Sequence, residues 1–221
     1  MAAPKKKQVV DRNYILSEFM TYVLEHERYP VSVYKFCKVA KLKEEEFYKF
    51  FGNLESIRKS IWSTFFEATV EAMKKNKEYA SFSSREKMLT LFYSLFETMT
   101  LNRSYILFVL KYHDQPMKNL KQLKGLRLHI KDFAADLIEE DNDEKKYKLA
   151  KNPVPIFSEG AWLQFLFLLN FWVGDESSSF EKTDIAIEKS VNTIFDLFDN
   201  TPLTNVLDFG KFLWNEKVMW N

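Results

Sequence analysis

The chain has 221 residues, a formal net charge of +1 and 46% hydrophobic residues, and this mixture excludes a globally disordered polymer. The single cysteine, Cys37, excludes an internal disulfide and suits a reducing cytoplasm. With 21 Phe but only 5 Gly and 6 Pro, the composition favours long helices over many short strands.

The N-terminus carries no signal-peptide pattern, so a cytoplasmic location is expected. The longest apolar run, 161–173, is interrupted by Gln164 and Asn170 and is too short to span a bilayer. Charge is uneven along the chain: residues 1–62 carry a formal +4 and the remainder −3. This asymmetry hints at an N-terminal part that faces a polyanion.

Residues 1–62 are predicted to form short helices followed by the start of a long one. Ser32 is expected to cap the second helix, a third helix is expected over about 43–50, and Asn53 is expected to cap the fourth. Apolar residues recur at helical spacing in three predicted buried stripes. These are Ile15, Phe19, Tyr22 and Val23; Val33, Phe36, Cys37 and Ala40; and Leu54, Ile57, Ile61, Phe65, Ala68 and Ala72.

Helical signals continue to the end of the chain. Ser83 and Glu86 form a capping box, Pro116 is predicted to open a longer helix, and Pro202 is predicted to open a final amphipathic one. The 161–173 segment is apolar nearly all round, so that helix must be buried on several sides. Because no segment alternates like a strand, we predict an all-α fold of about nine to ten helices.

The stretch "VSVYKFCKVAKLKEEEFYKFFGNLESI" resembles the TetR family of one-component repressors. Ser32 matches the family's capping residue, and Phe47, Tyr48 and Phe51 match its Leu-Tyr-x-x-Phe signature. The resemblance implies a three-helix helix-turn-helix DNA-binding domain over residues 1–62. It also implies a larger helical ligand-binding and dimerisation domain over residues 63–221.

Three departures from the family pattern fall on positions that face DNA. The family's turn glycine is Lys41 here, and its phosphate-binding lysine at the start of the fourth helix is Leu54. The small Ser-x-Gly-Thr stretch that opens the recognition helix is replaced by 43–46, which holds three glutamates. Those carboxylates either stabilise the positive end of their helix or approach DNA, where a Glu can accept from cytosine.

The resemblance and the charges together give a set of candidate DNA-binding residues. Tyr48 is either a phosphate contact or a half-buried core aromatic, and Ser32 is either a cap that also touches phosphate or a cap alone. The basic arm is either a backbone contact or a solubilising tail. The set is Ser32, Lys43, Glu44, Glu45, Tyr48, Lys49, Lys5, Lys6 and Lys7.

In this family the helices of the C-terminal domain surround a cavity. A sizeable apolar cavity would suit a lipid, fatty acid or aromatic compound, and the alternative is a solid core. The 161–173 and 187–198 helices are expected to pair with their copies in a homodimeric four-helix bundle. The candidate ligand-binding residues are Tyr93, Phe96, Phe108, Tyr112, Phe133, Trp162 and Phe165.

No catalytic, metal or cofactor site is predicted, because His26, His113 and His129 are far apart and no phosphate-cradling loop or nucleophile elbow is present. The sequence therefore predicts a regulator, not an enzyme. This regulator would bind double-stranded operator DNA and be released by an apolar small molecule. The alternative is a lipid-binding protein on the same fold, like the ubiquinone-biosynthesis accessory protein, that meets membranes through its terminal helix with Trp214 and Trp220.

Overall fold

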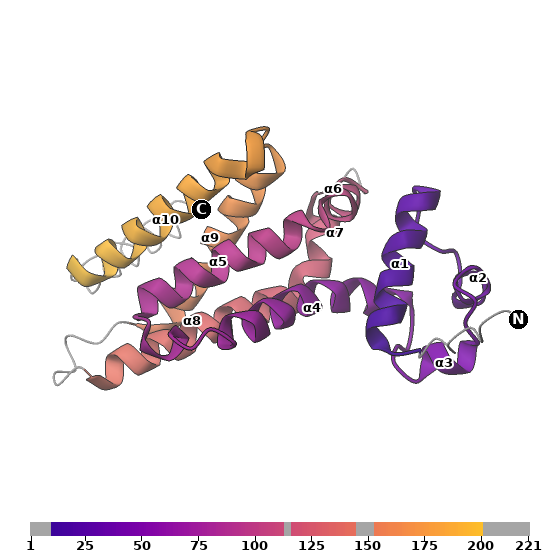
Figure 1. The fold of residues 1–221 in the computed structure, drawn as a ribbon, viewed down its shortest axis with the longest axis horizontal. Helices are drawn as coiled ribbons and strands as arrows, with labels where there is room; N and C mark the ends of the chain where they lie inside the picture. Colours follow the sequence, from indigo (N-terminus) through magenta and orange to yellow (C-terminus); the bar gives the residue numbers. More distant parts are fainter. Residues whose placement is uncertain (1–9, 113–115, 145–152, 201–221) are drawn as a thin grey trace, which may run out of the picture. The chain divides into compact units, whose positions relative to one another are not determined.

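The computed structural model describes residues 10–112, 116–144 and 153–200. Within these ranges every regular element is a helix, which confirms the predicted all-α fold (Figure 1). The elements are α1 (Arg12–His26), α2 (Val33–Val39), α3 (Glu44–Tyr48), α4 (Leu54–Lys74), η1 (Tyr79–Ser81), α5 (Ser84–Thr100), α6 (Arg103–Lys111), α7 (Pro116–Leu120), η2 (Lys121–Leu123), α8 (Lys124–Glu144), α9 (Val154–Val173), η4 (Ser178–Phe180) and α10 (Glu181–Asn200). The final helix predicted from Pro202 lies outside the described residues.

The described residues pack into two compact units. The first unit takes residues up to 71 together with 95–129, and the second takes 72–94 together with those after 129. Helix α4 continues through residues 62 and 63 without a break. The domain boundary predicted there stays a prediction.

In the first unit, α1 carries the predicted apolar stripe, and its four residues are all buried. The ring of Phe19 contacts Phe36 of α2 edge-on at 5.7 Å between centroids, and Phe36 contacts Phe47 of α3 at 6.1 Å. This chain of rings joins α1 to α2 and α3, and the last two, with seven and five residues, are too short to be stable alone. Aromatic burial therefore fixes α2 and α3 on α1.

The prediction for the second half of α4 was wrong. Ala68 and Ala72 are exposed, whereas Thr69 and Met73 are buried in their place. The Thr69 hydroxyl donates to the Phe65 carbonyl at 2.8 Å and lies 3.3 Å from the Thr98 hydroxyl of α5. The buried face of α4 turns toward this neighbour, which the helical period alone does not reveal.

The single helix predicted from Pro116 is interrupted. Helix α7 gives way to the tighter η2, in which the Lys124 N–H donates to the Lys121 carbonyl, and α8 begins afterwards. The Gln122 side chain donates to the Asn119 carbonyl at 2.9 Å, giving that carbonyl a partner outside the α-helical ladder. A polar side-chain contact therefore shapes this connection.

In the second unit, α9 and α10 lie side by side (Figure 1). Phe157 of α9 packs edge-on against Phe195 and Phe198 of α10, at 5.3 and 4.9 Å. Helix α9 begins seven residues before the predicted apolar run, and by length and composition it is the one described helix that would suffice to cross a membrane. A buried core helix passes the same test, and half of α9 is buried within the fold.

Candidate functional site

The second helix of the motif, α2, is held at both ends by hydrogen bonds. The Ser32 hydroxyl accepts from the Lys35 N–H at 3.2 Å, which confirms the predicted N-cap. At the other end, the Tyr14 hydroxyl of α1 donates to the Ala40 carbonyl at 3.3 Å. Since α2 has only seven residues, these contacts and the burial of Phe36 determine where it lies.

The turn between α2 and α3 contains a residue in the left-handed region. Lys41 has a φ of 55°, so the position where the family has glycine keeps the glycine conformation with a side chain present. The Leu42 N–H donates to the Cys37 carbonyl at 2.8 Å and closes the turn. This turn therefore keeps a left-handed residue, and the backbone of Lys41 bears the strain that a glycine would avoid.

Cys37 lies buried beneath this turn. Burial, and then the nearby carboxylates of Glu44 and Glu46, raise the pKa of its thiol to about 11. The thiol therefore stays protonated at neutral pH, which makes it a weak nucleophile. This agrees with the prediction that Cys37 serves as a small buried hydrophobic residue.

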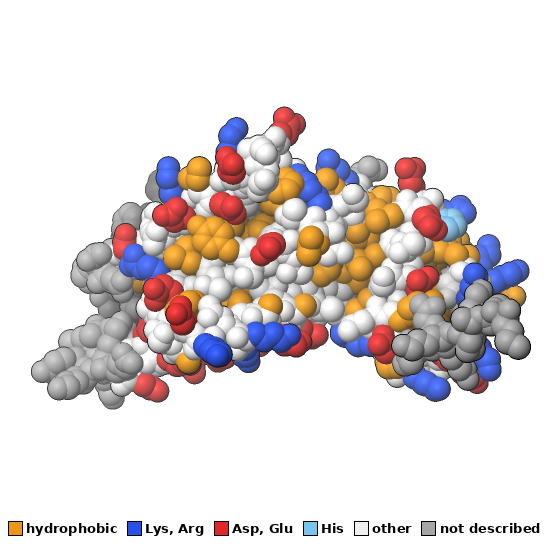
Figure 2. Space-filling view, in the orientation of Figure 1, with side chains coloured by type: hydrophobic (Ala, Val, Ile, Leu, Met, Phe, Trp, Pro, Cys, Tyr) orange, Lys and Arg blue, Asp and Glu red, His pale blue; other side chains and the backbone are white. Residues whose placement is uncertain are grey.

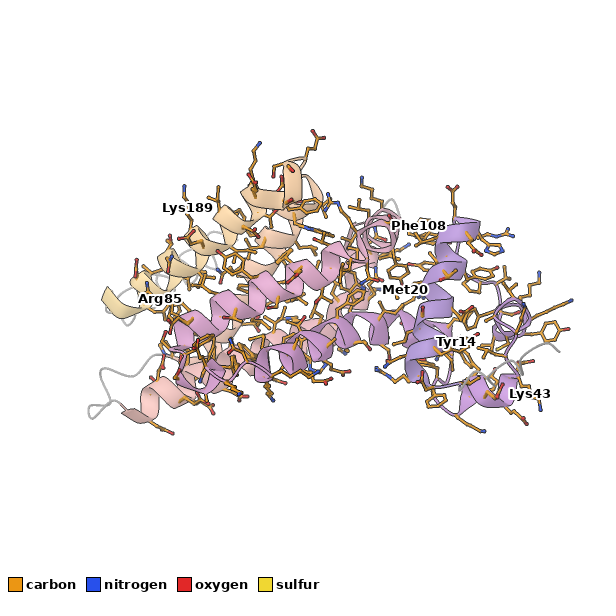
Figure 3. All side chains as sticks on the ribbon, viewed as in Figure 1. Tyr14, Met20, Lys43, Arg85, Phe108 and Lys189 are labelled. Atoms are coloured by element: carbon orange, nitrogen blue, oxygen red, sulfur yellow. The ribbon has the colours of Figure 1, made fainter. Side chains whose placement is uncertain are left out.

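The three glutamates that open α3 have different surroundings. Glu46 accepts from the N–H of Lys43 at 3.0 Å and so stabilises the start of its own helix. Glu45 forms an ion pair at 3.4 Å with the Lys43 ammonium, which is labelled in Figure 3. Glu44 is exposed and forms neither kind of contact within the described residues. Only one of the three carboxylates is thus left without a local role.

The predicted DNA-facing residues of α3 are at the surface. Tyr48 is 53% exposed while its ring contacts Phe47 edge-on at 5.2 Å, and Lys49 is exposed beside it. On the face shown in Figure 2, acidic and basic side chains are interleaved with exposed hydrophobic ones. The predicted basic arm, Lys5 to Lys7, lies outside the described residues.

Helices α9 and α10 form an apolar groove. Leu163 and Phe167 of α9 are 64% and 55% exposed, and Ile185 of α10 lies on the same groove with half of its surface open. The sequence predicted these two helices as a pairing surface, without assigning these side chains to it. The signal was the all-round apolar character of α9, which one neighbouring helix cannot cover.

The family model described as "Tetracyclin repressor-like, C-terminal domain" matches residues 87–213, which is more than half of the chain. This chain belongs to the TetR family. A solved structure of a protein from Syntrophomonas wolfei str. Goettingen, assigned as a TetR-family transcriptional regulator, has the same fold, with a TM-score of 0.65. It is 16% identical, and the alignment covers 83% of this chain and 93% of that one. No curated protein matches the sequence significantly.

The seven candidate ligand-binding residues of this TetR-family chain divide between the two compact units. Phe96, Phe108 and Tyr112 belong to the first, and the other four to the second. In the second, Trp162 stacks on the buried Phe165 at 5.4 Å, whereas Tyr93 and Phe133 are only partly buried. Their common role in a ligand cavity stays a prediction.

No group of side chains in the described ranges has the geometry of a metal site. His26 stacks on Tyr22 at 4.1 Å, and its Nδ1 lies 2.9 Å from the Tyr22 carbonyl. His129 stacks on Phe66 at 5.2 Å. Both rings therefore contribute to packing in the first unit.

Proposed function

We propose that this TetR-family protein is a cytoplasmic one-component transcriptional regulator that binds operator DNA through α2 and α3. The observation that supports this most is the division of roles among the glutamates of α3. Glu46 accepts from the start of its own helix and Glu45 pairs with Lys43, so two of the three carboxylates of α3 have partners within the protein. Tyr48 and Lys49 remain exposed for phosphate contacts, which provide most of the affinity for any DNA sequence.

Fluorescence anisotropy with the protein's own upstream DNA tests this proposal, with scrambled DNA as the reference and a salt series for both. We expect selective binding with a steep salt dependence. The variant Lys49→Ala should reduce the salt slope by about one phosphate contact. Lys74→Ala, at the exposed end of α4, is the matched control. It should change neither the selectivity for upstream DNA nor the salt slope. Equal, weak binding to both DNAs would contradict the proposal.

We propose that the operator is palindromic and that the protein binds it as a homodimer assembled through α9 and α10. An exposed apolar groove on the two long helices supports this, because a second copy would bury it by two-fold symmetry. Sedimentation velocity tests it with the double variant Leu163→Asp/Phe167→Asp. This variant should sediment as a monomer, whereas Leu128→Asp, on exposed α8, should leave the dimer intact.

The proposed effector is an apolar small molecule held by the aromatic residues of the C-terminal helices. It would change the distance between the α2–α3 pairs of the two protomers. That distance must match DNA half-sites that lie about one helical turn, or a multiple of it, apart. Native mass spectrometry of the purified protein tests for such a ligand. We expect the additional mass of a bound lipid or aromatic compound. Organic extraction should remove this mass and change the affinity for DNA. Unchanged mass and affinity would oppose this part of the proposal.

A further inference from the structure

A basic pocket of about 290 Å³ lies in the first unit, next to the connection between α1 and α2. Arg58 and Lys59 of α4 line it together with Lys118 of α7 and Lys121 of η2. The acid among its lining residues is Glu55, which is paired with Lys59 at 2.7 Å. The remaining positive charge favours an anion, and neither the DNA-reading nor the ligand proposal above uses this pocket.

Gln122, one of the residues that line the pocket, carries a buried acceptor without a donor in the described ranges. Gln122 is 9% exposed, and its amide nitrogen donates to the Val109 and Asn119 carbonyls at 3.3 and 2.9 Å. These two bonds fix the orientation of the amide. Its Oε1 atom is buried and has no hydrogen-bond partner among the described residues. Because an unpaired buried acceptor is costly, a ligand hydroxyl that reaches this atom after a shift of the Gln122 side chain would be stabilised.

Arg58 is held in place by an aromatic residue. Its guanidinium lies 4.6 Å from the centre of the Tyr29 ring, which also lines the pocket. Tyr29 in turn contacts Tyr112, the residue that follows α6, with ring centroids 4.2 Å apart. This stacking limits the rotamers of Arg58, so less conformational entropy is lost when its guanidinium binds an oxyanion.

We propose that this pocket binds a small phosphate ester that carries hydroxyl groups. Arg58, Lys118 and Lys121 contact the phosphate, and Gln122 Oε1 accepts from a hydroxyl of the ligand. A phosphate monoester carries nearly two negative charges at neutral pH, which matches the excess of lysine and arginine. The volume is at the lower end for ligand pockets, which limits the organic part to a few carbons.

Binding of a ligand in the pocket would also affect the position of α2 and α3, the helices proposed to bind DNA. Tyr29 lies in the connection between α1 and α2, and Arg58 holds it from α4. A phosphate that binds the guanidinium where it stacks on the ring strengthens the restraint on this connection. This coupling rests on the proposed DNA binding, whereas the binding of the ester itself does not.

Isothermal titration calorimetry of the full chain with glycerol 3-phosphate, in the absence of DNA, tests the proposal. Inorganic phosphate and glycerol serve as comparison ligands. We expect glycerol 3-phosphate to bind at least about tenfold more tightly than either. Lys118→Ala/Lys121→Ala should weaken it by at least about tenfold, while Lys74→Ala leaves it unchanged. Gln122→Leu, with its fold checked by circular dichroism, should remove the advantage over inorganic phosphate.

Two results would overturn the proposal. One is the absence of glycerol 3-phosphate binding in the unaltered protein, or binding that the double lysine variant does not weaken. The other is a double variant that loses affinity for upstream and scrambled DNA but not for the ester, since the lysines would then contact the DNA backbone. Because the calorimetry contains no DNA, failure of operator recognition leaves its result unaffected.

Discussion

The helix pair α2–α3 and the helix pair α9–α10 are positioned by different means. Helices α2 and α3 have seven and five residues, too few to be stable alone, and depend on caps and the rings of Phe36 and Phe47. Helices α9 and α10 have twenty residues each and pack along much of their length. A short helix is therefore sensitive to single contacts, whereas a long apolar helix has surface left over for a partner.

The largest expected effect comes from removing the central ring of the short pair. Phe47 is fully buried between Phe36 and Tyr48, so Phe47→Ala should cost about 3–5 kcal/mol. Because the loss is local, hydrogen exchange should accelerate in α2 and α3 and not in α9. Phe50→Ala, at a partly exposed ring, is the control and should cost under about 1 kcal/mol. Equal acceleration of hydrogen exchange in α2–α3 and in α9–α10 would show that the loss is not confined to the short pair.

The next effect concerns the loop that joins α9 to α10. Asp175 accepts from the N–H and hydroxyl of Ser177 and of Thr183, at 2.6–2.9 Å. Replacing the carboxylate by an amide in Asp175→Asn should destabilise the fold by about 1–3 kcal/mol in urea denaturation at neutral pH. Glu176→Gln, at the exposed neighbouring residue, should have little effect.

The Asp175 effect should also depend on pH. Burial alone would raise the pKa of Asp175, but the hydrogen bonds from Ser177 and Thr183 outweigh it and hold that pKa well below its usual range. The stabilisation is therefore fully present at neutral pH and is lost as pH falls below the unfolded-state pKa of about 3.9. The difference between the protein and Asp175→Asn should narrow at pH of about 3. A constant difference would show that the bonds do not require the charge.

The smallest expected effect is an increase in the stability of the α2–α3 pair. Lys41 has a φ of 55°, so Lys41→Gly should stabilise the helix-turn-helix by roughly 0.5–1 kcal/mol, after the entropy that glycine adds to the unfolded chain. The control is Lys38→Gly inside α2, which should cost up to about 1 kcal/mol. Thermal denaturation of both variants gives the comparison. Destabilisation by both would mean that the lysine side chain contributes more than its backbone strain costs.

Local signals in the sequence were sufficient for the elements of the short pair. The caps at Ser32 and Asn53 and the Ser83–Glu86 box follow from side chains that reach only three residues along the chain, and the structure confirms each.

Features that depend on distant neighbours were not predictable in the same way. The buried face of α4 turns to Thr69 because Thr98 lies opposite, and the basic pocket joins residues 29, 55–59 and 118–122. The individual environments of Glu44, Glu45 and Glu46 also required coordinates, since a run of like charges gives no sign of which carboxylate will cap its own helix.

By itself, the sequence determined the all-α fold, most of the helix starts and the resemblance to the TetR family, because hydrophobic period and capping act over a few residues. Only the tertiary structure decided that Lys41 keeps a left-handed turn, that Leu163 and Phe167 remain exposed, and that Gln122 lines a basic pocket and has a buried oxygen without a partner among the described residues. The physical reason is that exposure and hydrogen-bond satisfaction belong to pairs of groups far apart in the chain, which only folding brings together.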